Sequence, residues 1–292
     1  MPTTNTVTST YSGQAGVIIP AALNEARTIK DGLVSFAPNV SYKFNIPSLS
    51  DSGEFKNAAA GWNPDGTITL KDNSVTIKRI MAQRNIDKEA FVSAHNEFDS
   101  ILEAIMEERT AAAAEKFDKD IWVGTSATDG DFGGLVSLFE ADGNIVKPTA
   151  STTEVTKDTV LAELSTLVSE IPTKLRAKVD MKIVVSSNVA LAYEQLLIKS
   201  GVLSLADGSD KGMKYGRYTL VEVPYLSDNT FIAYQRANVW ACSDAQNIEN
   251  EVSAVDTAAT LLDGSVRTKI VFGGGTGYAH SEEIVYYVSA SV

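Results

Sequence analysis

The sequence predicts an α+β protein that combines a long β-hairpin, one long helix and a compact α/β lobe. Residues 41–81 contain two runs of alternating apolar residues separated by turn signals. Residues 91–120 have the three-and-four spacing of an amphipathic helix. Residues 150–245 alternate helical patterns with short β-rich runs. At 292 residues the chain is long enough to form either one elongated domain or two compact lobes.

The composition is that of a folded protein with an acidic surface. Of the 292 residues, 44% are hydrophobic and 21% are charged. The net charge of −12 disfavours direct nucleic-acid readout, which relies on clustered Lys and Arg. A single cysteine, Cys242, excludes an internal disulfide and a thiol zinc cluster, and it fits a reducing compartment. With neither a signal-peptide pattern nor an apolar run of about 18 residues, we expect no export and no membrane span.

The first 81 residues predict an arm followed by a projecting hairpin. Residues 1–16 are mostly small and polar, which is typical of an unpacked arm. The hairpin strands have alternating apolar positions, namely Tyr42, Phe44 and Ile46 on the outgoing strand and Ile68, Leu70, Val75 and Ile77 on the return strand, which is expected to run to Met81. Turn signals lie between them at 50–53 and 63–66, where Pro64 and Gly66 suit a type I turn. A two-stranded hairpin is marginal in water, so one that carries Phe55 and Trp62 is expected to lie on a neighbouring subunit.

The helix over about 91–120 is expected to act as a strut of about 45 Å. Its predicted apolar stripe consists of Phe98, Ile101, Leu102, Ile105, Ala112 and Ala113. Four glutamates lie off this stripe: Glu103, Glu107, Glu108 and Glu115. They indicate a solvated face, with a functional acidic surface as the alternative.

A polar, Thr-rich connector near residue 150 predicts the start of a second lobe. Its first helix has apolar residues from Val160 to Leu175, with Pro172 kinking or ending it. The expected elements that follow are a buried strand at 181–187, a helix at 188–199, a loop at 204–216 and strands at 218–224, 231–234 and 238–242. From residue 248 the pattern is β again, and it is expected to return to the first lobe.

The sequence contains no recognisable catalytic or metal-binding motif. The glycine run at 273–277 lacks a P-loop lysine, so a hairpin or glycine bend is favoured over an anion site. The segment 129–134 lacks the later ligands of a calcium loop, and a flexible loop is favoured. His95 and His280 form no ligand-spaced pair, Cys242 fits a small buried hydrophobe, and no nucleophile elbow occurs. We therefore expect no catalytic residue, no cofactor, no metal and no enzyme activity.

With this order of elements, the chain resembles the major capsid proteins of tailed bacteriophages, whose fold is shared with encapsulins. The stretches that carry the resemblance are FDKDIWVGT, KIVVSSNVALAYEQL and VRTKIVFGGGTGYAHSEEIVYY. The resemblance covers nearly the whole chain and rests on architecture. It implies five parts, namely an N-terminal arm (1–36), an extended hairpin loop (37–80), a peripheral domain with the spine helix (81–149), an axial domain (150–245) and a return to the peripheral domain (246–292).

The resemblance implies that the protein is structural. Copies of the chain would form pentamers and hexamers of an icosahedral shell around double-stranded DNA, without sequence-specific contact and without a membrane. Portal and other virion proteins would be further partners, and the chain would be found in the virion and, during assembly, in the host cytoplasm. An acidic chain agrees with this role, because basic patches would bind the packed genome and hinder its release.

Two loops are the expected assembly contacts. In the hairpin they are Phe55, Lys56, Trp62, Pro64 and Gly66, and in the axial loop they are Asp207, Asp210 and Lys211. Some relatives join a loop lysine to an asparagine of another subunit. Lys56 and Lys71 lie in the hairpin here, but no partner motif is visible, so no cross-link is predicted.

Three other interpretations remain open. An encapsulin-like compartment shell is the nearest. A tail-tube subunit or another virion structural protein is the second. The third, a hydrolase or transferase with an α/β core, is disfavoured because the sequence lacks nucleophile and phosphate motifs.

Overall fold

The computed structural model describes residues 26–51, 66–87, 98–151, 154–178, 180–201, 213–244, 252–256 and 265–289. Its helices are α2 (Arg27–Lys30), α4 (Phe98–Val123), α5 (Leu135–Ala141), α6 (Val160–Ser169), α7 (Thr173–Arg176) and α8 (Ser187–Lys199), with short 3-10 turns η2 (Arg236–Asn238) and η3 (Ser281–Glu283). Its strands are β1 (Ser35–Ala37), β2 (Lys43–Asp51), β3 (Ile68–Thr76), β4 (Lys78–Asp87), β5 (Met181–Val185), β6 (Lys214–Tyr215), β7 (Tyr218–Glu222), β8 (Thr230–Gln235), β9 (Val239–Ser243), β10 (Val252–Asp256), β11 (Ser265–Tyr278) and β12 (Val285–Val288). This mixture confirms the α+β prediction.

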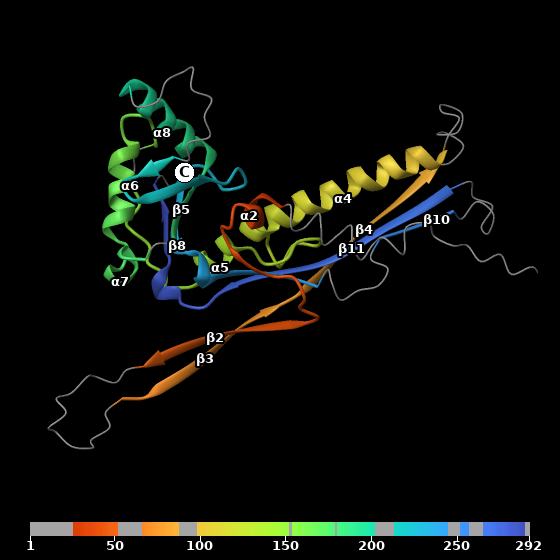
Figure 1. Ribbon diagram of the computed structural model, residues 1–292, viewed down its shortest axis with the longest axis horizontal. Coiled ribbons are helices and arrows are strands. Elements are labelled where there is room, and N and C mark those ends of the chain that lie inside the picture. Colours follow the sequence, from red (N-terminus) through yellow and green to blue (C-terminus); the bar gives the residue numbers. More distant parts are fainter. Residues whose placement is uncertain are drawn as a thin grey trace, which may run out of the picture.

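Strand β11 is the axis of the elongated part of the molecule. It pairs with β4 along one edge and with β10 and then β9 along the other, all antiparallel. Gly274 pairs with Lys78 on one side and with Ser243 on the other. Strand β1 adds to β9 in parallel. Helix α4 runs alongside β4 and β11 (Figure 1).

The predicted apolar stripe of α4 is tested only in part, because the side chains of Phe98, Ile101 and Leu102 lie outside the described part of the chain. Ile105 is half-buried and Ala113 packs against the main core. Within its described side chains, the buried apolar and polar positions follow helical spacing and are Met106, Thr110, Phe117, Asp118, Asp120, Ile121 and Trp122. Ala112, which was expected on the buried face, is exposed. Because the alanines at 111–114 bury little area on any face, the larger Phe117 and Ile121 decide which side of the helix packs.

The C-terminal end of α4 and three of its four glutamate side chains lie in the described part of the chain. The helix continues three residues beyond the expected end at Asp120, and residues 91–97 lie outside the described ranges. Glu107, Glu108 and Glu115 are exposed, which confirms a solvated face at these positions. The side chain of Glu103 lies outside the described part of the chain.

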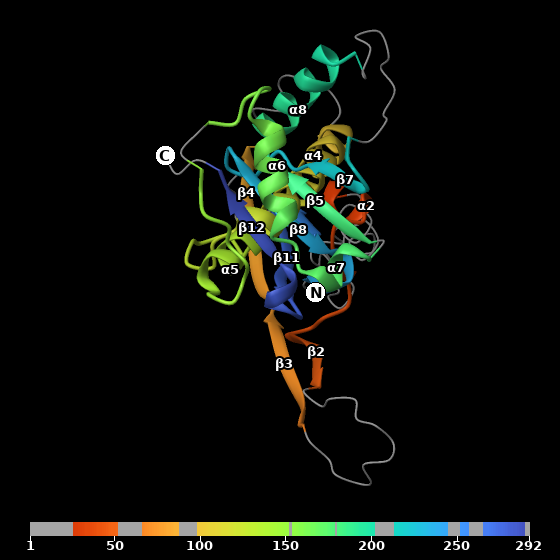
Figure 2. The same ribbon diagram turned by 90° about the vertical axis from the view of Figure 1, so that its left-hand side faces the viewer.

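The compact lobe is built on a second sheet with the order β12-β8-β5-β7-β6. Helices α6 and α8 lie together at this end of the molecule (Figures 1 and 2). Their apolar faces close a core that includes Leu164, Leu167 and Ile183, all fully buried. Helix α6 ends at Ser169 and α7 begins after Pro172, which confirms that this proline ends the first helix.

Two strands belong to sheets other than those expected from the sequence. Strand β9, expected in the compact lobe, pairs with β1 and β11 instead. Strand β12, expected to return to the first lobe, pairs with β8 in the second sheet. Apolar alternation shows that a strand has a buried face but does not identify its hydrogen-bonding partner, so the sequence could not predict these pairings.

The glycine run at 273–277 does not form the predicted hairpin or bend. These residues lie inside β11, which is continuous over 14 residues. A Cβ on Gly273 would lie 2.4 Å from the Asp244 carboxylate, and one on Gly274 would lie 2.4 Å from the Phe132 ring. The glycines are therefore needed for close packing against both faces of the strand.

The segment 129–134 is packed against the body rather than being the flexible loop predicted. Phe132 is buried in the main core, with its ring centroid 5.4 Å from that of Phe117. The Asp131 carboxylate accepts a hydrogen bond from Lys116, which also bonds Asp120. These contacts hold the turn that leads into α5.

The return strand of the hairpin divides at Ile77. Residues 68–76 pair with β2, whereas residues 78–87 leave the hairpin and pair with β11, so the expected single strand to Met81 is wrong. The hairpin projects beyond the rest of the described chain in both ribbon views (Figures 1 and 2). Ile77 alone thus connects hairpin strand β3 to β4 of the central sheet.

Candidate interaction surface

The paired strands β2 and β3 give the hairpin two faces of different character. Lys43 pairs with Thr76 and Asp51 with Ile68, in antiparallel register throughout. Because side chains alternate across a strand, Ile46, Val75 and Ile77 share one face, and Ile68 and Leu70 share the other. The first face packs on the body and the second points away from it.

The inner face forms a small apolar core with β9 and β11. Its buried members are Val40, Ile46, Val75, Ile77 and Cys242. The Phe44 ring adds to this core, with its centroid 5.3 Å from that of Trp240. A Cβ on Gly277 would lie 2.4 Å from Val75 Cγ2, so the glycine allows the hairpin to rest directly on β11.

Polar side chains fasten the same region to the end of β11. Asn73 Nδ2 donates to the carbonyl oxygens of Tyr278, at 3.1 Å, and Ala279, at 2.7 Å. The Ser48 hydroxyl lies 3.1 Å from His280 Nδ1. Asn238 in turn holds His280, because its Oδ1 accepts from the His280 backbone N–H at 2.7 Å. The base of the hairpin is therefore anchored by both apolar packing and hydrogen bonds.

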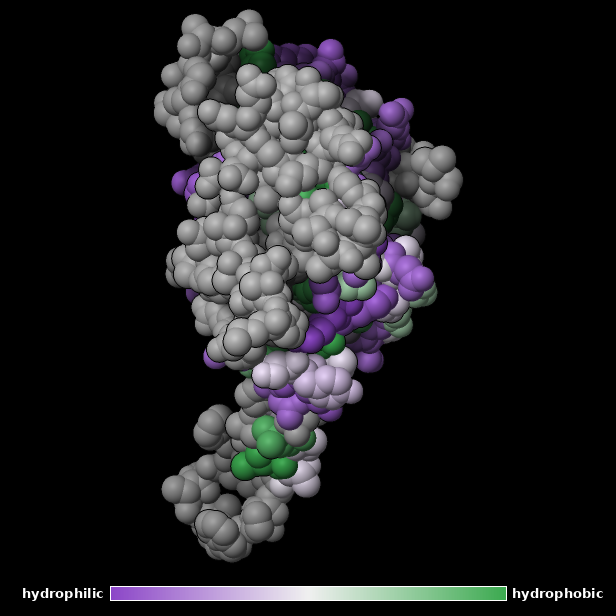
Figure 3. Space-filling model, turned by 90° about the vertical axis from the view of Figure 1, so that its right-hand side faces the viewer, coloured by the Kyte–Doolittle hydropathy of each residue, from purple (hydrophilic) through white to green (hydrophobic). Residues whose placement is uncertain are grey.

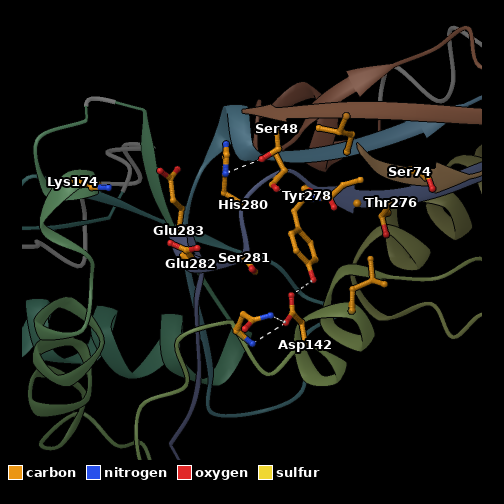
Figure 4. A pocket seen from close by; sticks show the side chains of 17 residues that line it. Ser48, Ser74, Asp142, Lys174, Thr276, Tyr278, His280, Ser281, Glu282 and Glu283 are labelled. Carbon is orange, nitrogen blue, oxygen red and sulfur yellow. Dashed lines mark hydrogen bonds between the residues drawn. The ribbon is translucent and has the colours of Figure 1, made fainter. Parts of the chain in front are cut away.

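Beside this anchor lies a polar cavity of about 670 Å³. It lies between the hairpin base, the residues after α5 and the turn from β11 to η3 (Figure 4). Asp142 contributes one wall and accepts hydrogen bonds from the Tyr278 hydroxyl, at 2.7 Å, and the Asn144 backbone N–H, at 2.8 Å. These bonds, first that of Asn144, hold the pKa of Asp142 below its usual range.

The outer face of the hairpin exposes large apolar side chains. Ile68 is 71% exposed and Leu70 is 63% exposed. Figure 3 shows a hydrophobic patch on the projecting part of the molecule. Two exposed apolar residues at positions i and i+2 on a paired strand form a surface suited to contact with another protein.

Most of the site residues predicted from the sequence lie outside the described ranges. Those residues are Phe55, Lys56, Trp62, Pro64, Asp207, Asp210 and Lys211. Gly66 is described, is exposed and has a φ of 118°, in the region that favours glycine. Lys71 lies in β3, where it pairs with Ser48.

The residues weighed for chemistry have structural contacts in the described part of the chain. Cys242 is fully buried, and burial raises the pKa of its thiol to about 12, which confirms that it is a small buried hydrophobe. His280 contacts Ser48 and Asn238, whereas His95 lies outside the described ranges. The described residues contain no group of three His, Cys, Asp or Glu side chains that could hold a metal ion. None of the described helices combines the length and the hydropathy of a bilayer span.

The anchor residues Ser48, Asn73 and His280 were not predicted from the sequence. Asn73 did carry a signal, because asparagine is unfavourable in the middle of a strand. Its partners are more than 200 residues away, so that signal could not identify them.

The fold is similar to that of solved capsid structures. The chain matches the capsid of Myoviridae phage XM1 with a TM-score of 0.62 and 15% identity, over 90% of this chain and 91% of the other. It matches the capsid of an empty GTA particle with a TM-score of 0.63 and 11% identity, over 93% and 90%. It also matches the virus-like particle from Pyrococcus furiosus with a TM-score of 0.55 and 10% identity, over 95% and 99%.

Sequence comparison gives no corresponding relative. No protein-family model matches the chain, and no curated protein matches it significantly. The structural likeness spans at least nine tenths of the chain in each of the three comparisons above. The chain therefore has the fold of the major capsid proteins of tailed bacteriophages.

Proposed function

We propose that this protein is the major capsid protein of a tailed bacteriophage, and that its copies assemble into pentamers and hexamers of an icosahedral shell that encloses double-stranded DNA. The observation that carries the proposal is the fold likeness to the phage XM1 capsid over 90% of this chain and 91% of the other. The matched fold accounts for most of this chain. The role is accordingly structural rather than enzymatic.

The projecting hairpin supports assembly on physical grounds. Its base is fixed to β11, while Ile68 and Leu70 are exposed on its outer face. Leaving two large apolar side chains in water forgoes about 1.5–3 kcal/mol of burial free energy for each. Contact with a neighbouring copy recovers part of this burial free energy. Because the base of the hairpin is already fixed to β11, less conformational entropy is lost on binding.

The remaining assignments follow from the same proposal. Residues 1–36 act as an arm, 37–80 as the hairpin loop, 81–149 and 246–292 as the peripheral domain and 150–245 as the axial domain. The assembly contacts are Phe55, Lys56, Trp62, Pro64 and Gly66 in the hairpin and Asp207, Asp210 and Lys211 in the axial loop. The protein works in the virion after assembly in the host cytoplasm, with the portal as a further partner and with no sequence-specific DNA contact.

A second candidate function is that of an encapsulin-like compartment shell. The match to the Pyrococcus furiosus virus-like particle, over 95% of this chain and 99% of the other, favours it. The two functions predict different contents for the assembled particle. Particles purified from a native source should contain double-stranded DNA if the chain is a phage capsid protein, and a cargo protein without genomic DNA if it is a compartment shell.

Loss of the apolar hairpin face tests the assembly role. Ile68→Thr combined with Leu70→Thr keeps β propensity and removes apolar surface, so the chain should fold normally but form no closed shells. Met81→Thr is the matched control, because Met81 is also exposed, at 54%, but lies on β4 in the body. Light scattering and electron microscopy measure assembly, and circular dichroism measures folding. Shells formed by the double variant at the parent's yield would contradict the proposal.

A further inference from the structure

Two arginines lie on the side of the β4–β11 pair that α4 covers. Ile80, Arg84 and Ile86 are separated by even numbers of residues along β4, so their side chains lie on the same face of the strand. Ile80 and Ile86 are buried on this face. Arg109 lies on α4 between Met106 and Thr110, which are both buried. Burial lowers the pKa of Arg109, and the charge of the nearby Arg84 lowers it further. Arg84 and Arg109 thus lie on the facing sides of the sheet and the helix, and their charges interact.

This arginine pair forms no ion pair within the described part of the chain. No salt bridge of the described residues includes Arg84 or Arg109. Arg84 donates to the backbone oxygen of Gln83 at 3.1 Å, and Arg109 Nε is buried without a hydrogen-bond partner. Thr268, which is opposite Arg84 in the β4–β11 register, also has a buried hydroxyl without a partner.

Such an arrangement is unfavourable in an isolated chain. Like charges repel, and a buried donor without an acceptor costs about 1–3 kcal/mol. The chain carries 37 acidic residues against 25 basic ones, so carboxylates are in excess, yet no carboxylate of the described residues forms a salt bridge with either arginine. The exposed Arg84 leaves the pair accessible from outside.

We propose that Arg84 and Arg109 form a binding site for a carboxylate group of a second copy of this chain. The planar guanidinium group matches a carboxylate in geometry, and two guanidinium groups together hold one strongly. A copy with a net charge of −12 supplies carboxylates and repels the phosphates of nucleic acid, which favours a protein partner. This inference rests on the proposed function, because it assigns one of the contacts between neighbouring copies.

The test compares Arg84→Gln/Arg109→Gln with a control that changes the charge equally. Arg217→Gln/Lys157→Gln serves as that control, since both residues are exposed and lie in the compact lobe. The unassembled arginine-pair variant should melt at or above the parent's temperature, because the repulsion and the unpartnered donor are removed. Its critical concentration for shell assembly should rise about tenfold or more, whereas that of the control should stay close to the parent's.

Four results would overturn the inference, and one of them concerns the proposed function as well. A critical concentration equal to that of the control would show that the pair makes no contact between copies. A large fall in the melting temperature of the unassembled variant would show that the arginines stabilise the chain itself. Normal shells with a weakened, salt-dependent retention of DNA would identify the ligand as phosphate. A parent protein that stays monomeric at every concentration would overturn both the inference and the proposed function.

Discussion

Ser48 Oγ lies 3.1 Å from His280 Nδ1, which links two residues that are 232 positions apart in the sequence. Ser48 is only 2% exposed although it lies on the hairpin. This contact and the two hydrogen bonds from Asn73 fix the base of the hairpin to the end of β11. These contacts therefore fix the orientation of the hairpin, and with it that of its outer face, relative to β11.

Replacing Asn73 should loosen this anchor without unfolding the protein. Asn73→Ala removes two hydrogen bonds and leaves two backbone carbonyls without their donor, at a cost of about 1–3 kcal/mol. Hydrogen exchange of the β2 and β3 amides should become faster. Asn45→Ala, in the exposed position of the partner strand, is the control and should leave exchange unchanged. Equal exchange in both variants would argue against the anchor.

Gly277 should not tolerate a side chain. Gly277→Ala would place a Cβ 2.4 Å from Val75 Cγ2 and should lower the free energy of unfolding by about 1–3 kcal/mol, measured by denaturant titration. Gly143→Ala, where a Cβ meets nothing within 4 Å, should be nearly neutral. Adding Val75→Ala to Gly277→Ala makes room for the new methyl, so the double variant should lose less than the sum of the single variants. Strict additivity would show that the two residues do not pack together.

Cys242 should be chemically inert in the folded protein. Burial raises the pKa of its thiol to about 12, so at pH 8 almost none of it is the reactive thiolate. A thiol reagent should label the native chain very slowly and the chain in guanidinium chloride at once. Rapid labelling of the native protein would contradict the burial of this residue in the hairpin core.

Asp142 should contribute to stability at neutral pH and lose that contribution in acid. Its pKa is held below the ordinary value of about 3.9, chiefly by the backbone N–H of Asn144 and then by the Tyr278 hydroxyl. Because the folded pKa is depressed, the stabilisation is present above the unfolded pKa and disappears as the pH falls through the folded one. The melting temperature of Asp142→Asn should therefore fall less steeply than that of the parent between about pH 5 and about pH 2. Parallel pH profiles would contradict this role.

Local patterns predicted much of the fold. The apolar spacing from Val160 to Leu167 predicted α6, and Pro172 predicted its end, because both depend on neighbouring residues only. The alternation around Val75 and Ile77 likewise predicted a buried hairpin face. The order and lengths of the elements were sufficient for the resemblance to a capsid fold.

Long-range pairing could not be predicted in the same way. Nothing local to Lys78 shows that β4 leaves the hairpin for β11, and nothing local to Val285 shows that β12 joins β8. Gly273 and Gly274 suggested a bend because glycine is common in turns, whereas the close approach of Asp244 and Phe132 explains them. The arginine pair was missed for the same reason, since Arg84 and Arg109 meet only when α4 lies on the sheet.

A cryo-electron microscopy reconstruction of the particles formed by the purified chain tests whether the protein assembles into a shell through its hairpin. We expect closed polyhedral shells in which Ile68 and Leu70 of each hairpin are buried against a neighbouring copy. Tubes, or shells whose hairpins keep these two side chains in solvent, would contradict this expectation.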